Sequence, residues 1–394
     1  MASPAQAARP RRRADFADAL IGIACGLTAI FALVFIPVAA IHPPAGRDYL
    51  LYWATARQLV HHANPYDPVA LAALEHALGQ HALGFMRNPP FALPLVWPLG
   101  FIGARAGGVL WTVVLIAVLV AAMRALWPVV AMPGAKLAWL GYLSPLAIHV
   151  VIAGQTSLFS LLGLALFLRL HRSRPFVAGM ALWFCALKPH LLLPWMTALL
   201  VWIVFSRAWG VLAGALTALA ASCALTAWID PRAWSQYLAW AHNSGVAEEK
   251  LACVSVALRN LIDPRAHWLT FLPAAIGCVW AVAWFWKYRR QWDWAEHGSL
   301  VLLVSLAVTP YCWAWDQCLA IPALIFAASR SESRAVLAAL AGSYLAIDVL
   351  LVCSFGMHSP AWIWLGPFWL FWYVWARRSP ARRAGTSLTS ASTF

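Results

Sequence analysis

The stretch ADALIGIACGLTAIFALVFIPVAAI, residues 17–41, carries one charged side chain, Asp18. A helix needs about 20 apolar residues to cross the roughly 30 Å hydrocarbon core of a bilayer, so this stretch is long enough to do so. It is also longer than the apolar core of a signal peptide and has no A-x-A cleavage site. We therefore expect an uncleaved membrane anchor that is preceded by a basic tail.

Similar apolar runs recur along nearly the whole chain of 394 residues, of which 63% are hydrophobic and 11% are charged. A soluble domain has about 25% charged residues, so a soluble fold is excluded. The runs lack the alternating pattern of outer-membrane barrel strands, and helices satisfy their own backbone groups in lipid. The sequence predicts an all-α polytopic integral membrane protein with about 12 transmembrane helices.

The positive charges explain the net charge of +14. They cluster between apolar runs, as the positive-inside rule describes for cytoplasmic loops, so both termini are expected in the cytoplasm of a bacterium with the chain in its inner (plasma) membrane. No basic run is interleaved with aromatics in a soluble segment, and no nucleic acid partner is expected. The clusters are Arg9/Arg11/Arg12/Arg13, Arg169/Arg172/Arg174, Lys287/Arg289/Arg290, Arg330/Arg334 and Arg377/Arg378/Arg382/Arg383.

We expect one transmembrane domain over residues 17–376, with a basic tail at 1–16 and a cytoplasmic tail at 377–394 whose Ser- and Thr-rich end is disordered. Two polar outer loops are expected at 42–88 and 230–267. The expected crossings are 17–41, 106–127, 137–153, 155–170, 176–190, 191–206, 208–229, 268–286, 298–310, 313–328, 334–353 and 360–376.

The Pro-rich stretch from Pro89 to Ile102 is a further apolar piece, and the charge clusters leave no room for it as a full crossing. Prolines break a helix and free carbonyl groups that lipid cannot satisfy. We therefore predict a re-entrant or tilted segment that is buried in protein or borders a cavity.

Most ionisable residues outside the basic clusters fall at one face of this topology, and such residues mark function when they converge. They are Asp48, Arg87, Lys188, His190, Asp230, Glu248, Glu249, Lys250, Arg259 and Asp316. The eight cysteines and the histidines of the first outer loop match no metal-ligand spacing, so neither a metal nor another cofactor is expected. A polar site at the outer face follows.

The segment from Gly46 to Leu59 has helical periodicity, and Asp48, Tyr52 and Thr55 lie on one of its faces. The segment ends at a turn that begins with Asn64, so a short interfacial helix would hold Asp48 at the mouth of a cavity. Asp is also a common helix N-cap, which is the structural alternative.

Lys188 and His190 stand where two apolar runs meet, and they are read either as a phosphate clamp or as a lysine snorkelling to the interface. Gln155 follows Gly154, and two interpretations are open: the pair is only a turn before a helix start, or Gln155 is a residue of the site. Asp316 lies close to an apolar run and needs a partner or water.

These motifs, in this order, resemble glycosyltransferase family 87, also called domain of unknown function 2029, whose members have the GT-C membrane fold. The matching pieces are Asp48-Tyr49-x-x-Tyr52-Trp53-x-x-Ala56, Asn64-Pro65-Tyr66-Asp67, Pro89-Pro90 with Pro94 and Pro98, Gly154-Gln155-x-Ser157, Lys188-Pro189, Lys250 through Ser255 to Arg259, and Thr309-Pro310-Tyr311.

The resemblance implies an inverting transfer of a hexose, often mannose, from a polyprenyl-phosphate-sugar donor to a lipid or glycan acceptor among the membrane lipids. Asp48 would be the catalytic base on the periplasmic side. The donor phosphate would lie near positive groups, and other polar side chains would line the substrate pocket. The expected phosphate-binding residues are Arg87, Lys188, His190 and Lys250, and the expected pocket residues are Tyr52, Gln155, Tyr311 and Asp316.

Two other classes remain open on the residues alone. A transporter or flippase of lipid-linked substrates would usually show repeated halves and ionisable residues near the bilayer midplane, and this chain shows neither pattern. A structural or assembly scaffold would have no active site. Loss of sugar transfer in an Asp48→Asn variant that still folds would separate the enzyme from both.

Overall fold

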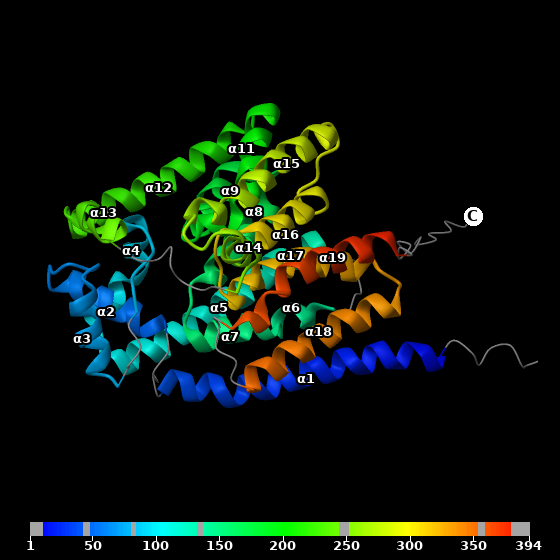
Figure 1. Ribbon diagram of the computed structural model, residues 1–394, viewed down its shortest axis with the longest axis horizontal. Coiled ribbons are helices and arrows are strands. Elements are labelled where there is room, and N and C mark those ends of the chain that lie inside the picture. The colour runs from blue at the N-terminus through cyan, green and yellow to red at the C-terminus, as the bar shows by residue number, and fades with distance from the viewer. Residues whose placement is uncertain are drawn as a thin grey trace, which may run out of the picture.

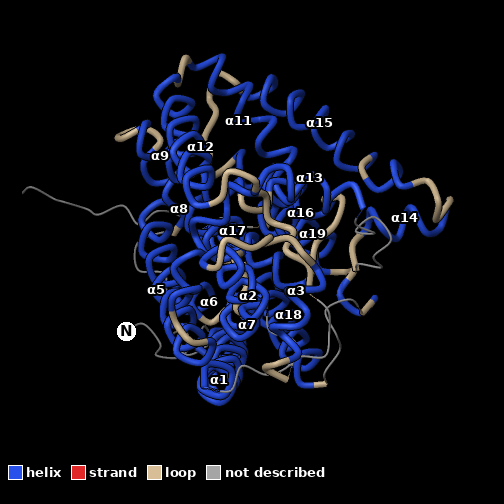
Figure 2. Tube along the Cα trace, turned by 90° about the vertical axis from the view of Figure 1, so that its left-hand side faces the viewer, coloured by secondary structure: helices blue, strands red, loops and turns tan. Residues whose placement is uncertain are grey.

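The computed structural model describes residues 11–41, 48–79, 84–131, 137–243, 252–353 and 359–379, and in these ranges the regular elements are helices (Figure 2). The all-α prediction is confirmed. The helices of nine or more residues are α1 (Arg11–Ile41), α2 (Asp48–Val60), α3 (Pro68–His76), α5 (Ala104–Val130), α7 (Pro145–Ala153), α8 (Ser157–Leu170), α11 (Leu193–Ser206), α12 (Trp209–Ile229), α13 (Ala233–Asn243), α14 (Val254–Ile262), α15 (Leu272–Tyr288), α16 (His297–Val308), α17 (Ile321–Arg330), α18 (Arg334–Val352) and α19 (Leu365–Arg378). The shorter ones are η2 (Pro90–Ala92), α4 (Leu93–Val96), η3 (Trp97–Phe101), α6 (Ala138–Tyr142), α9 (Pro175–Ala181), α10 (Trp183–Ala186), η4 (Pro189–Leu192), η6 (His267–Thr270), η7 (Ala314–Ala320) and η8 (Pro360–Trp362).

Six helical stretches in the described ranges are long and apolar enough to cross a membrane. They are Ala17–Ile41, Ala104–Val130, Pro189–Ser206, Trp209–Ile229, His267–Tyr288 and Arg334–Val352. Five apolar helices of 10–17 residues accompany them: Pro90–Phe101, Trp139–Ala153, Ser157–Leu170, Pro175–Ala186 and His297–Val308. The chain is therefore an integral membrane protein, with six full-length candidate spans where the sequence predicts about 12 crossings.

Prolines explain why several expected crossings are shorter or broken. The expected crossing 137–153 is divided between α6 and α7, and α7 begins at Pro145. The expected crossing 313–328 is likewise divided, into η7 and α17, with Pro322 in the first turn of α17. Proline suits the first turn of a helix and disfavours helical geometry in the residue before it, and Ser144 before Pro145 is extended, so α7 begins there. Ile321 before Pro322 keeps helical geometry, so η7 passes directly into α17.

The two ends of the helical bundle differ in what they carry (Figure 1). The helices α2, α3 and α13 gather at the left of this view, and α1 begins at the right, where α19 ends. Both ends of the described chain thus lie on the side opposite α2.

The Pro-rich segment 90–101 consists of η2, α4 and η3 and packs against α2 and α12. Side chains of these two helices donate hydrogen bonds to its carbonyl groups. From α12, Ser222 donates to the Phe91 oxygen at 2.5 Å, and Thr226 donates to the Pro90 oxygen at 2.8 Å. The indole of Trp53 in α2 similarly donates to the Ile102 oxygen at 2.9 Å. Burial against protein therefore supplies the donors that a proline-broken backbone needs.

Close helix contacts hold the bundle together. Gly214 of α12 faces the Phe176 carbonyl of α9 so closely that a Cβ atom would overlap it, which is the close approach that small residues permit between membrane helices. Thr28 of α1 donates to an Asp348 carboxylate oxygen of α18 at 2.9 Å. Asp348 is an intramembrane acid that the sequence reasoning did not single out.

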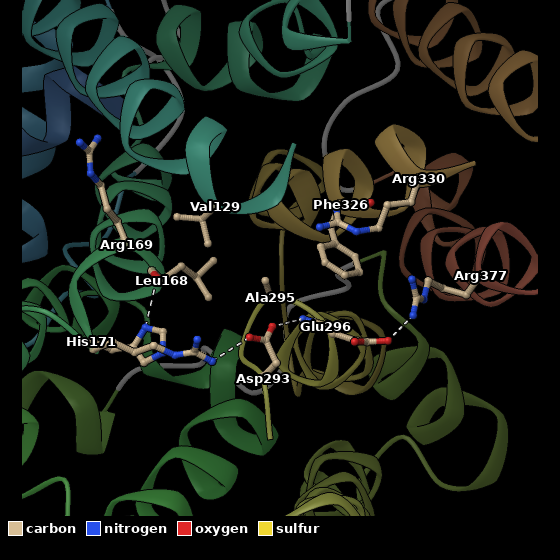
Figure 3. A pocket seen from close by; sticks show the side chains of 11 residues that line it. Val129, Leu168, Arg169, His171, Asp293, Ala295, Glu296, Phe326, Arg330 and Arg377 are labelled. Atoms are coloured by element: carbon tan, nitrogen blue, oxygen red, sulfur yellow. Dashed lines mark hydrogen bonds and ion pairs between the residues drawn. The ribbon is translucent and has the colours of Figure 1, made fainter. Parts of the chain in front are cut away.

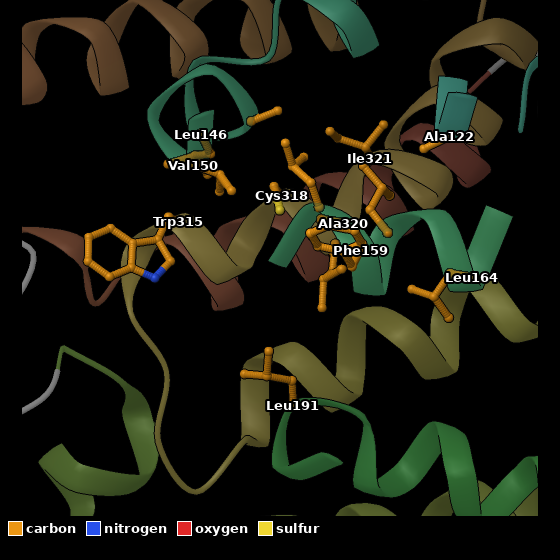
Figure 4. Packing of buried hydrophobic residues seen from close by; sticks show 14 of the residues in the cluster. Ala122, Leu146, Val150, Phe159, Leu164, Leu191, Trp315, Cys318, Ala320 and Ile321 are labelled. Carbon is orange, nitrogen blue, oxygen red and sulfur yellow. The ribbon is translucent and has the colours of Figure 1, made fainter. Parts of the chain in front are cut away.

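The segment η7 lies in the middle of the apolar core, and all seven of its residues are buried. Figure 4 shows Trp315, Cys318 and Ile321 among apolar side chains of α7 and α8. Because the flanking residues are packed on several sides, the position of Asp316 is fixed by the core. This element delivers a carboxylate to the site described below.

Candidate active site

Asp48 is the first residue of α2, and its carboxylate accepts a hydrogen bond from the side-chain amide of Gln155. Gln155 follows Gly154, which ends α7 in the left-handed conformation at φ +76°. A Cβ atom at Gly154 would lie 2.6 Å from the Cβ of Tyr49, so glycine allows this turn to reach the start of α2. Tyr49 also donates to the Ala104 oxygen at 2.7 Å, which fixes α2 against α5.

The amide of Gln155 has a defined orientation. Its Oε1 accepts from the backbone N–H of Thr156 and from the hydroxyl of Tyr52, each at 3.1 Å. A backbone N–H can only donate, so the oxygen must face it and Nε2 must face Asp48. Tyr52 and Gln155, both predicted as pocket residues, therefore hold the Asp48 carboxylate in place.

A buried ion pair lies next to this group. The ammonium group of Lys188 is 2.7 Å from Oδ1 of Asp316, and both side chains are almost fully buried. Lys188 also donates to the Ser157 hydroxyl at 3.0 Å, and that hydroxyl lies 2.5 Å from the same carboxylate oxygen. The backbone N–H of Trp313 donates to Oδ2 of Asp316. Asp316 thus has the partners that its burial requires.

Aromatic side chains complete the cluster. The guanidinium of Arg87 lies 5.0 Å from the ring centre of Trp313, within the range of a cation–π contact. The imidazole of His190 stacks on Tyr311, with ring centres 3.9 Å apart. The His190 carbonyl accepts from Thr309 at 3.1 Å, which ties the segment after α10 to the segment after α16.

Electrostatic effects connect these groups. Burial raises the pKa of the Asp48 carboxyl above its ordinary value, and the negative charge of Asp316 adds to the rise. The hydrogen bond from Gln155 and the positive charges of Lys188 and Arg87 act in the opposite direction. Burial lowers the pKa of Arg87, while the charge of Asp48 raises it. Asp48, Arg87, Lys188 and Asp316 therefore form one cluster with two acidic and two basic groups.

The structure brings together eight of the nine predicted site residues, from five separate parts of the chain. The ninth, Lys250, lies outside the described residues, as do Glu248 and Glu249. Asp230 serves elsewhere, since its Oδ1 accepts from the backbone N–H of Arg232 before α13. Arg259 is buried in α14, where its guanidinium lies 3.4 Å from the ring of His267.

Two residues of the cluster were not predicted as site residues. Ser157 bridges Lys188 and Asp316, and Trp313 contacts both Arg87 and Asp316. Their nearness in sequence to predicted site residues could have indicated them: Ser157 stands two residues after Gln155, and Trp313 stands three before Asp316. As for metals, the part of the chain that the structure describes has no group of three or more His, Cys, Asp or Glu residues that could hold an ion.

Comparison with known proteins gives one match. A model of glycosyltransferase family 87 matches residues 85–310, more than half of the chain. The matched range includes Arg87, Gln155, Lys188 and His190, whereas Asp48 precedes it. Comparison with curated proteins and with solved structures gives no match.

Proposed function

The chain belongs to glycosyltransferase family 87, and from this premise we propose that it moves a hexose, with mannose favoured, from a polyprenyl-phosphate-sugar to a lipid or glycan acceptor. In this proposal the reaction takes place at the periplasmic face of the bacterial inner membrane, with inversion at the anomeric carbon. The observation that carries it is the Asp48 carboxylate, held by Gln155 beside the basic groups Lys188 and Arg87.

Asp48 acts as the general base. As the acceptor oxygen attacks the anomeric carbon, its proton moves to an Asp48 carboxylate oxygen, and the bond between that carbon and the phosphate oxygen breaks with its electron pair going to the phosphate. A base is more effective when its pKa is closer to the working pH, and burial raises the pKa of Asp48 in that direction. Gln155 directs the carboxylate by hydrogen bonding.

Positive charge stabilises the departing lipid phosphate, which needs no protonation to leave. Arg87 is partly exposed and lies over Trp313, from which its guanidinium can reach a ligand. Lys188 is paired with Asp316, so the phosphate would share or replace that carboxylate as the partner of Lys188. Lys250 and His190 are further candidates for the same role. Tyr52, Tyr311 and Asp316 would line the sugar pocket.

The test is sugar transfer by an Asp48→Asn variant, measured as radiolabel moved from polyprenyl-phosphate mannose into membrane lipids. Asn keeps the size of the side chain and cannot take the proton. We expect a loss of about 10²–10⁴-fold, the usual contribution of a general base. Elution of a single monodisperse peak from size-exclusion chromatography in detergent would show that the variant folds.

The matched control is Asp67→Asn at the same end of the protein. Asp67 caps α3 by accepting from the backbone N–H groups of Val69 and Ala70, and Asn caps a helix equally well. This variant should transfer sugar at the unmodified rate. Full transfer by Asp48→Asn would remove Asp48 as the base, and transfer of other hexoses but not mannose would correct the sugar while leaving the base in place.

A further inference from the structure

A polar cavity lies at the end of the bundle opposite α2, among the ends of α8, α17 and α19 (Figure 3). Its volume is about 470 Å³. Four arginines and two carboxylates are among the lining residues, which leaves an excess of positive charge. The charged groups are Arg169, Arg172, Arg330, Arg377, Asp293 and Glu296.

We propose that this cavity, here called the arginine pocket, binds a phosphate group. The proposal is independent of the sugar, the acceptor and the catalytic role of Asp48. Because the arginine pocket lies with the basic clusters that the positive-inside rule assigns to the cytoplasm, its ligand would come from the cytoplasmic leaflet or from the cytosol. An anionic lipid headgroup and a soluble phosphate compound share the chemistry that would be recognised.

Two arginines of the pocket keep hydrogen-bond donors for a ligand. In the described residues, the hydrogen bonds of Arg330 all run through Nη1, to the oxygens of Val130, Phe326 and Ser329. Those of Arg169 likewise run through Nη1, to the Arg124 oxygen. A guanidinium has five N–H donors, so both side chains keep donors for a phosphate.

The positive charge of the arginine pocket is only partly compensated by its carboxylates. Arg172 pairs with Asp293 at 2.9 Å, and Arg377 pairs with Glu296. Within the described residues, Arg169 and Arg330 have backbone or hydroxyl oxygens as acceptors, and these neutralise no charge. A doubly charged phosphate would balance the two remaining cations.

Two of the positive charges are held on one aromatic ring. The guanidinium carbons of Arg330 and Arg377 lie 3.8 and 5.3 Å from the centre of the same Phe326 ring. Burial lowers the pKa of Arg330 and the charge of Arg377 lowers it further, while Glu296 and Asp293 oppose this only in part, so the pKa stays below its ordinary value. An anion between the two side chains would relieve this repulsion.

The arginines also have a simpler structural role, because cations stabilise the C-terminal ends of helices. That role requires no ligand and predicts no saturable binding. Binding measurements on variants therefore separate the two accounts.

The experiment uses delipidated full-length protein in detergent, with three probes: short-chain phosphatidylglycerol, short-chain phosphatidylcholine and inorganic pyrophosphate. Native mass spectrometry counts bound lipid, and thermal unfolding midpoints follow each titration. The test variant is Arg169→Gln/Arg330→Gln, which leaves both ion pairs in place. The control is Arg174→Gln, which removes an arginine at the same end that does not line the pocket.

We expect saturable binding of at least one anionic probe, and at least about a tenfold loss of affinity in the double variant, since a hydrogen bond to a charged group contributes about 1.5–3 kcal/mol. The control should bind as the unmodified protein does. Phosphatidylglycerol binding without pyrophosphate binding would identify a lipid site, and the reverse would identify a soluble ligand.

Three results would overturn the proposal. These are no saturable binding of either anionic probe, equal affinity of the double variant and the control, and equal binding of phosphatidylcholine with no loss in the double variant. Should the double variant fail to fold, the single variant Arg169→Gln answers the same question, because Arg169 is exposed and gives up one bond to a backbone oxygen.

Discussion

Replacing Gln155 by Leu should move the pH dependence of transfer in a direction that the site geometry dictates. Gln155 donates to the ionised form of Asp48, and this hydrogen bond lowers the pKa that burial has raised. Without the donor the carboxylate holds its proton more firmly, so the pKa rises further. A hydrogen bond to a charged group contributes about 1.5–3 kcal/mol and one pKa unit corresponds to about 1.4 kcal/mol, so the rise should be about 1 to 2 units.

The assay is the pH profile of kcat/KM for sugar transfer. A base works when it is deprotonated, so the rate falls as pH drops through the pKa of Asp48. In the unmodified enzyme the midpoint of this acid limb should lie above about 4, the ordinary value for Asp. In Gln155→Leu the acid limb of the kcat/KM profile should move to higher pH. At pH values above the new midpoint, much of the lost kcat/KM should return.

The control substitution is Gln317→Leu. Gln317 is also buried and donates to the Leu306 oxygen, but it makes no contact with Asp48 in the described structure. Its acid limb should stay where the unmodified enzyme has it. An unchanged limb in Gln155→Leu, with the rate reduced equally at every pH, would refute Asp48 as the titrating base and leave Gln155 a purely structural role.

Three further predictions concern the surroundings of the site. Lys188→Met should lower stability by about 3–5 kcal/mol because it leaves Asp316 charged and buried, and the double variant Lys188→Met/Asp316→Leu should regain most of the unfolding midpoint but no activity. Gly154→Ala should destabilise the protein by about 1–3 kcal/mol and reduce transfer, since φ is +76° and the new Cβ would press on α2; an unchanged midpoint would contradict this. Cys253 and Cys312 line the same small cavity, so copper-phenanthroline oxidation should join their thiols in a disulfide that mass spectrometry detects without reduction, whereas recovery of both as free thiols would show that they are not within reach of each other.

The sequence predicted the helical class and a short helix that carries Asp48 near its beginning, because both follow from local patterns. Apolar length predicts a membrane helix, and Asp48 stands where a polar loop meets a helical period. The break after Lys188 could also be anticipated, since Pro189 follows it. The number of full-length spans could not be predicted in the same way. Hydropathy counts an apolar run as one continuous helix even where a proline divides it into shorter ones.

The contacts within the site could not be read from the sequence. Lys188 and Asp316 are far apart along the chain, and only the packing of η7 between α7 and α8 brings them to 2.7 Å. The sequence suggested that Lys188 binds phosphate or extends to the membrane interface. In the structure its ammonium group forms a buried ion pair with Asp316. Ser157 was visible within a motif, but its bridging role depends on both partners.

Because Lys188 is already paired with Asp316, its ammonium group attracts a stray anion less than an unpaired ammonium would. Ordinary phospholipids are far more abundant than any carrier lipid, and an unpaired ammonium group near the membrane surface would bind their phosphate groups. Here a headgroup must compete with Asp316 for Lys188, which costs energy in a water-poor setting. Under the proposed function, a lipid-linked donor that also binds the site through its sugar would offset that cost, so its binding would be favoured over that of an ordinary phospholipid.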